Sequence, residues 1–81
     1  MTPSPGSESQ TVAAIRDLLG RATRDLARVN TASLGGDGRA QYDTAKRFII
    51  QADDAIKAKN LVFAKSLADK AVALAAQLAG R

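Results

Sequence analysis

The sequence predicts an all-α fold, an antiparallel three-helix bundle, on the strength of three observations. First, apolar residues recur alternately three and four positions apart in three successive stretches, at about residues 10–29, 39–58 and 61–78. Second, a glycine-rich segment (32–38) and a short polar segment (57–60) separate these stretches. Third, 81 residues is the size of a single small domain. Because residues with this spacing share one helical face, each helix needs a partner surface, and three helices can bury one another.

The first helix is expected over about residues 10–29. Its apolar face consists of Val12, Ile15, Leu19, Ala22, Leu26 and Val29. The preceding residues have the composition of a flexible linker, with Pro3, Pro5 and Gly6, and residues 2–9 hold nothing that could pack into a core. We therefore expect residues 1–9 to be a disordered linker and residues 10–81 to form the domain, as a fragment of a longer protein.

The second helix, expected over about residues 39–58, follows a loop in which Leu34 is the one apolar anchor. Asp37 is expected at the cap or in the first turn of this helix, where a negative charge interacts favourably with the helix dipole. At the other end, Asn60 is expected to take the left-handed conformation that ends a helix. Because the third helix begins near Leu61, the second and third helices must form an antiparallel hairpin.

The third helix, expected over about residues 61–78, has apolar residues over about half of its circumference, which suits a helix that contacts two neighbours. It is therefore expected to be the central helix, with Leu67 and Leu74 in the core. Seventeen alanines in the chain favour helix and allow the helix axes to approach closely.

Few residues in the chain could support catalysis. The sequence has no cysteine and no histidine, which removes thiolate chemistry, the commonest general base and the commonest metal ligand. Asp53 and Asp54 are adjacent on a helix and so point about 100° apart. The glycine-rich loop lacks the lysine and the preceding strand of a phosphate-binding loop. We therefore expect no enzyme, no catalytic residues, no cofactor and no metal, and no apolar stretch is long enough to insert into a membrane.

Apolar or small residues outside the predicted core faces favour protein docking. Ile50 falls on the charged side of the second helix, where the bundle cannot bury it, and Val62 is a similar outlier on the third helix. On the first helix, small residues recur seven positions apart and form a strip that another helix could approach closely. The candidate protein interface comprises Ile50, Asp54, Lys57, Val62, Ala13, Gly20 and Ala27. Docking to a protein partner, or self-association, is the leading interpretation.

Nucleic-acid binding is the alternative interpretation. The net charge is +4, and Arg21, Arg24 and Arg28 fall on the outer side of the first helix, where they could bind phosphates or another anion. Against this, Asp17 and Asp25 partly neutralise that side, and few aromatic residues are available to stack on bases. An enzyme ranks third.

Residues 48–71 resemble a tetratricopeptide-type helical hairpin. Phe48 stands where that motif has a large aromatic residue, and Ala52, Ala64 and Ala71 stand where it needs small residues for close helix approach. The sequence departs from the motif at Gln51, Ala68 and Ala76, and no second copy follows.

A hairpin with one extra helix also resembles the microtubule-interacting-and-transport type of three-helix domain. It is similar, too, to uncharacterised alanine-rich helical domains of bacterial envelope proteins. These resemblances imply protein binding rather than catalysis, and the last implies a place in the bacterial cell envelope. None of them assigns a ligand-binding residue to this chain.

Overall fold

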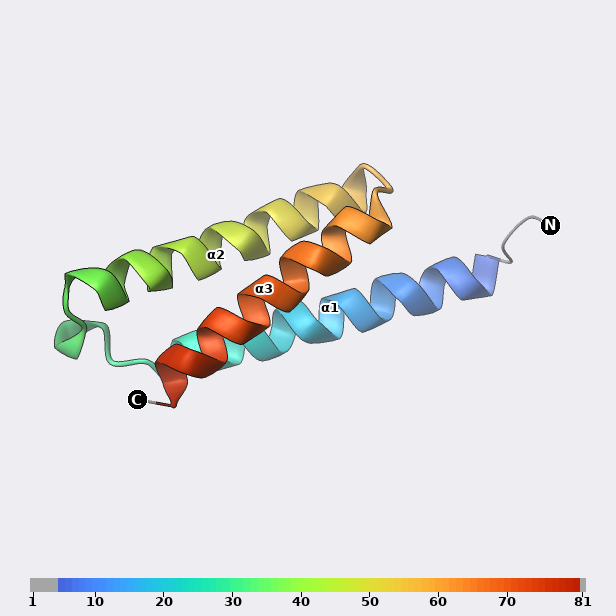
Figure 1. The fold of residues 1–81 in the computed structure, drawn as a ribbon. Helices are drawn as coiled ribbons and strands as arrows, with labels where there is room; N and C mark the ends of the chain where they lie inside the picture. The colour runs from blue at the N-terminus through green and yellow to red at the C-terminus, as the bar shows by residue number, and fades with distance from the viewer. Residues whose placement is uncertain (1–4, 81) are drawn as a thin grey trace.

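The protein is an antiparallel three-helix bundle. The computed structural model describes residues 5–80, and the side chains of residues 8–80. Its helices are α1 (Pro5–Ala27), α2 (Gly36–Lys57) and α3 (Leu61–Ala79), and a short 3-10 helix, η1 (Thr31–Ser33), lies between α1 and α2. In Figure 1, α2 runs opposite to both α1 and α3. The predicted fold class is therefore confirmed.

Helix α1 begins earlier than the sequence analysis predicted. It starts at Pro5 rather than near residue 10, so residues 5–9 belong to the helix and not to a linker. Proline fits the first turn of a helix because its missing N–H has no partner there in any case. The prediction of disorder for residues 1–4 lies outside the described residues. At its other end α1 stops at Ala27, where the Arg28 and Val29 N–H groups donate to the Asp25 and Leu26 carbonyls.

Helix α3 is the central helix, as predicted. It packs along both α1 and α2, whereas α1 and α2 have few contacts with one another. Alanines with no exposed surface lie where the helices meet; they are Ala22, Ala45, Ala52, Ala64, Ala68, Ala71 and Ala75. Since alanine is short, the helix axes can approach closely at these positions.

The two predicted core leucines of α3 differ in burial. Leu67 is 4% exposed and packs with Ile15, Leu19 and Ile56, so its core position is confirmed. Leu74 is only partly buried; it packs against the cluster around Leu26 and Leu78, at the edge of the core rather than in its middle as predicted. Their difference shows that part of α3's wide apolar face remains open to solvent.

The turn between α2 and α3 has a different arrangement from the predicted one. Lys59, not Asn60, has the left-handed backbone conformation, with φ of 62°. The Lys59 N–H donates to the Ile56 carbonyl and the Asn60 N–H donates to the Ala55 carbonyl, which is the Schellman pattern of helix ends. Asn60 instead caps α3, where its side chain accepts a hydrogen bond from the Phe63 N–H at 3.4 Å.

The loop between α1 and α2 is held by local hydrogen bonds and by Leu34. The Asn30 side chain accepts a hydrogen bond from the Ala32 N–H at 3.1 Å, and the Ser33 hydroxyl donates to the Asn30 carbonyl at 2.9 Å. Leu34 packs against the core cluster at this end of the bundle, which confirms it as the apolar anchor. Helix α2 then begins at Gly36, three residues earlier than predicted, with Asp37 in its first turn as expected.

Candidate functional site

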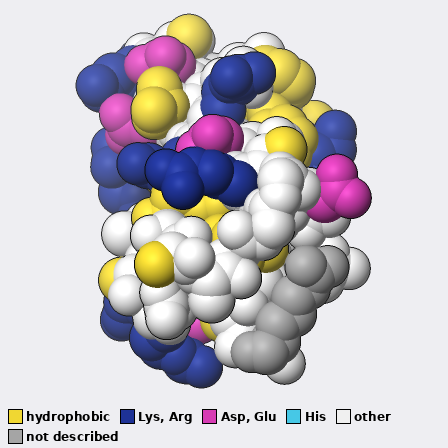
Figure 2. Space-filling model, turned by 90° about the vertical axis from the view of Figure 1, so that its left-hand side faces the viewer, with side chains coloured by type: hydrophobic (Ala, Val, Ile, Leu, Met, Phe, Trp, Pro, Cys, Tyr) yellow, Lys and Arg dark blue, Asp and Glu magenta, His cyan; other side chains and the backbone are white. Residues whose placement is uncertain are grey.

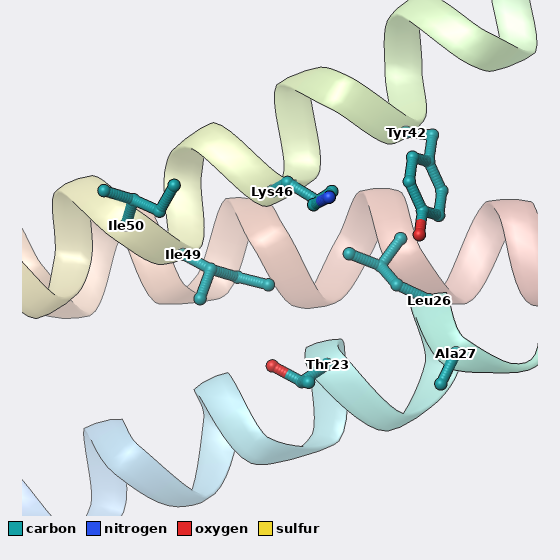
Figure 3. A pocket seen from close by; sticks show the side chains of 7 residues that line it. All are labelled: Thr23, Leu26, Ala27, Tyr42, Lys46, Ile49 and Ile50. Carbon is teal, nitrogen blue, oxygen red and sulfur yellow. The ribbon is translucent and has the colours of Figure 1, made fainter.

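A groove lies between α1 and α2 on the side of the molecule away from α3. One part of it has a volume of about 320 Å³, and α3 passes behind that part in Figure 3. Thr23, Leu26, Ala27, Tyr42, Lys46, Ile49 and Ile50 line this part. The groove continues into a second hollow of about 340 Å³, which shares Thr23, Ile49 and Ile50 and adds Arg16, Leu19, Gly20 and Asp53. We call the whole feature the α1–α2 groove; it lies between two helices that both pack on α3 but have few contacts with one another.

The α1 wall of the groove is formed by small residues. Gly20, Thr23 and Ala27 succeed one another along the helix at spacings of three and four, so they share one face. The Thr23 hydroxyl donates to the Leu19 carbonyl of its own helix at 2.8 Å, so it has a partner already. A Cβ built on Gly20 would have no atom within 4 Å, so this wall is open to an approaching surface.

The α2 wall carries the larger apolar side chains. Ile49 is partly buried against both core clusters, whereas Ile50 is 61% exposed. The Lys46 ammonium lies 5.6 Å from the centre of the Tyr42 ring, within the range of a cation–π contact. The α2 wall therefore combines an exposed isoleucine with a cation held over an aromatic face.

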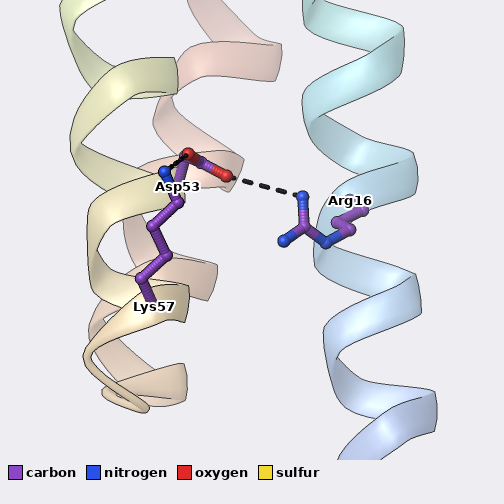
Figure 4. Close-up of polar contacts among 3 residues, drawn as sticks. All are labelled: Arg16, Asp53 and Lys57. Carbon is purple, nitrogen blue, oxygen red and sulfur yellow. Dashed lines mark hydrogen bonds and ion pairs between the residues drawn. The ribbon is translucent and has the colours of Figure 1, made fainter.

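An ion-pair cluster joins the two walls of the groove at its second hollow. Arg16 Nη1 of α1 lies 3.4 Å from Asp53 Oδ1 of α2, and Lys57 Nζ lies 3.0 Å from Asp53 Oδ2 (Figure 4). The hydrogen bond from Lys57 lowers the pKa of Asp53 below its usual 3.8. Partial desolvation opposes this, and the charges of Lys57 and Arg16 add to the lowering. The carboxylate of Asp53 is thus held ionised between two cations, one from each side.

The structure brings together three of the seven residues predicted to form a protein interface. Ile50, Gly20 and Ala27 line the α1–α2 groove, although they come from two separate helices. Asp54 lies instead beside a shallow hollow with Phe63 and Ala58, near the α2–α3 turn. Lys57 reaches the groove only through its ion pair with Asp53.

The remaining two predicted interface residues lie elsewhere. Val62 is 87% exposed and lines a hollow with Thr11 and Lys65. Ala13 lies beside Val12 and Arg16 near the start of α1. The α1–α2 groove therefore contains three of the seven candidate interface residues, drawn from both the Ile50 face and the small-residue strip.

Sequence reasoning missed several groove residues. Tyr42 and Ile49 line the groove and are only partly buried, but neither is among the candidate interface residues. The Arg16–Asp53 pair joins residues 37 positions apart, and spacing along the chain carries no signal for such a contact.

The three arginines proposed for anion binding are exposed and lie outside the groove lining; Arg21 and Arg24 are on α1, whereas Arg28 follows the last residue of that helix. Arg28 Nη1 lies 3.6 Å from Asp25 Oδ1, whereas Arg21 and Arg24 have no ion pair with any of the described residues. Figure 2, which views the end of the molecule where α1 and α2 are joined, shows Lys and Arg side chains interspersed with acidic and hydrophobic ones. The visible face is not a continuous basic surface.

Within residues 5–80, no group of three or more acidic, histidine or cysteine side chains is placed to hold a metal ion. Over the same part of the chain, no helix is both long and apolar enough to cross a membrane. Comparisons with models of protein families, with curated proteins and with solved structures found no match.

Proposed function

We propose that this protein is a non-catalytic protein-interaction module that binds its partner through the α1–α2 groove. The observation that carries this proposal is the exposed Ile50 on the wall of an apolar groove between two helices that scarcely touch. An exposed apolar side chain beside a concave, mostly apolar surface is typical of the centre of a docking site.

The walls of the groove differ in a way that suits a helical partner. Gly20 and Ala27 make the α1 wall shallow, so a partner backbone could approach it closely. Ile49 and Ile50 on the α2 wall offer bulk for a partner side chain to pack against. Lys46 and the Arg16–Asp53 pair lie at the polar edge that commonly surrounds such a contact.

The resemblance to a tetratricopeptide hairpin adds support. The three positions where that motif needs small residues, Ala52, Ala64 and Ala71, are occupied by alanines with no exposed surface. Burial of small residues at these positions is compatible with that resemblance, and proteins built from such hairpins act by binding other proteins.

The test replaces Ile50 by aspartate and compares it with Val62→Asp. Both side chains are exposed, Ile50 at 61% and Val62 at 87%, but only Ile50 lines the groove. We expect Ile50→Asp to abolish association, measured by sedimentation and by pull-down from the native extract, with unchanged helicity and melting temperature. Val62→Asp should leave association intact. Equal association by both folded variants and the unchanged protein would exclude the groove as the docking site.

Nucleic-acid binding remains the second candidate, because Arg21 and Arg24 are exposed and have no ion pair in the described part of the chain. Its test is the affinity for a labelled duplex and a labelled single strand at increasing salt. Binding through phosphates falls steeply with salt concentration, because it releases counterions. Replacing Arg21, Arg24 and Arg28 by glutamine should then abolish binding, while Ile50→Asp should not change it.

A further inference from the structure

The charges of α2 are arranged antisymmetrically about Ile50. Four residues before Ile50 stands Lys46 and four after it stands Asp54; seven before it stands Asp43 and seven after it stands Lys57. Each charge on one side of Ile50 thus has the opposite charge at the same separation on the other side. A helix with this pattern is electrostatically complementary to a copy of itself that runs in the opposite direction.

These residues share one face of α2. Successive spacings of three or four residues place them on one side of a helix, and Lys46 and Ile50 both line the groove. Lys46 and Asp54 are exposed, and neither forms an ion pair with any residue in the described part of the chain. Lys57 is engaged by Asp53, but its side chain is still 70% exposed. The complementary charges of this face are therefore largely unused within one molecule.

We propose that the partner seated on this face is a second copy of the chain, with the two α2 helices antiparallel and a two-fold axis at Ile50. This inference rests on the proposed function, because it names the occupant of the same site. In such a pair, the two Ile50 side chains meet on the axis. Lys46 then faces Asp54 of the second copy about 6 Å from the axis, and Asp43 faces Lys57 of the second copy at about 10.5 Å, given the rise of a helix.

The other charges of this part of α2 obey the same symmetry. Arg47 and Asp53 each stand three residues from Ile50, on opposite sides and with opposite charges. All six charged residues between positions 43 and 57 therefore form opposite pairs under one two-fold axis. Like charges placed face to face would oppose association, so the consistent pairing specifies this register.

Helix α1 is compatible with the same axis. Gly20 lies at the level of Ile50, since both line the same part of the groove. Asp17 and Arg24 flank Gly20 on the exposed side of α1, and neither has an ion pair among the described residues. Asp17 stands three residues before Gly20 and Arg24 four residues after it, so an axis at the level of Gly20 brings them near, but not directly opposite, one another. The missing Cβ of Gly20 leaves room for the second copy there.

Single charge reversals and their mixture provide the decisive experiment. In the Lys46→Asp variant, the carboxylate at position 46 of each copy faces Asp54 of the other copy, so two pairs of like negative charges form. In the Asp54→Lys variant, Lys46 of each copy faces the cation at position 54 of the other copy, so two pairs of like positive charges form. Each variant alone should dimerise at least about tenfold more weakly than the unchanged chain. When the two variants are mixed, every contact becomes attractive again, so a heterodimer should form. The double variant Lys46→Asp with Asp54→Lys should dimerise by itself.

Sedimentation equilibrium measures these outcomes as a change from 8.5 kDa to twice that mass. Circular dichroism checks that each variant is folded, and both positions are exposed, so folding should persist. The matched control reverses the charges of Lys65 and Asp69 on α3. These two exposed residues form an ion pair, with Lys65 Nζ 3.1 Å from Asp69 Oδ2, and they do not line the groove. This control should leave dimerisation unchanged.

Disulfide trapping tests the position of the axis independently. The chain has no cysteine, so a single introduced one reports on one position only. Ile50→Cys should oxidise readily to a covalent dimer because each copy meets itself on the axis. Val62→Cys is the control; Val62 is more exposed but lies off the groove, so it should cross-link far more slowly.

The inference is overturned if the unchanged chain remains monomeric up to millimolar concentration, or if mixing the two single variants does not restore a dimer. In either case the proposed function is still judged separately, by whether Ile50→Asp removes a different protein from the pull-down. If Ile50→Asp changes neither dimerisation nor the binding of another protein, both this inference and the proposed function are overturned.

Discussion

Arg16 Nη1 of α1 lies 3.4 Å from Asp53 Oδ1 of α2, although the two residues are 37 positions apart in the chain. The contact joins the two helices that have the fewest contacts with one another, at the second hollow of the groove. Lys57 holds the other oxygen of the same carboxylate. The ion pair that joins α1 to α2 at the groove therefore depends on the ionised carboxylate of Asp53.

Acid should weaken the bundle through Asp53. Because its folded-state pKa is lowered from 3.8, the ionised carboxylate stabilises the fold above that pH, and this contribution is lost as the pH falls through the folded-state value. We expect the urea midpoint of Asp53→Asn to lie below that of the unchanged protein near neutral pH, and the two to converge as the pH falls below 3.8. Asp17→Asn is the control, since Asp17 is exposed and should change the midpoint little. A constant difference at all pH values would contradict this role.

Leu67 should matter more to stability than Leu74. Leu67 is 4% exposed and lies in the core, so Leu67→Ala should lower the free energy of unfolding by about 2–5 kcal/mol. Leu74 is partly buried, so Leu74→Ala should cost clearly less. Chemical denaturation measures both, with Val62→Ala at an exposed site as the control that should change stability by less than about 0.5 kcal/mol. Equal losses for the two leucines would show that the burial of α3 differs from that described.

Replacing Lys59 by glycine should stabilise the protein. Lys59 has φ of 62°, a conformation that is costly for residues with a Cβ and free of that cost for glycine. Its backbone hydrogen bonds, which end α2, do not depend on the side chain. We expect Lys59→Gly to raise the free energy of unfolding by about 1 kcal/mol. Ala58→Gly is the matched control: its φ is −82°, so the same replacement one residue earlier should bring no gain.

Replacing Gly20 by alanine should also stabilise the single molecule. A Cβ at this position meets no atom within 4 Å, and alanine is favoured over glycine inside a helix by about 0.5–1 kcal/mol. Gly38 provides the comparison, because a Cβ there would lie 3.1 Å from Leu34 Cδ2. Thermal unfolding should therefore show a rise for Gly20→Ala and a smaller one, or a loss, for Gly38→Ala. The opposite order would mean that Gly20 is packed more tightly than described.

Much of the fold could be predicted from the sequence because helix formation and helix burial follow local spacing. The three helices, the central place of α3 and the core position of Leu67 all depend on residues three and four apart on one helix. The exposure of Ile50 followed in the same way, from its place on the charged side of α2. At the α2–α3 turn, spacing along the chain does not distinguish Lys59 from Asn60 as the residue with the left-handed backbone conformation.

The sequence by itself thus determined which residues form helices and which face of each helix seeks burial, since these depend on contacts within a few residues. Only the tertiary structure decided that α1 and α2 have few contacts with one another, that Gly20, Ala27 and Ile50 line one groove, and that Arg16 reaches Asp53. These relationships depend on how closely the helices pack, which is set by side-chain volumes at three interfaces at once. Periodicity on a single helix does not contain that information.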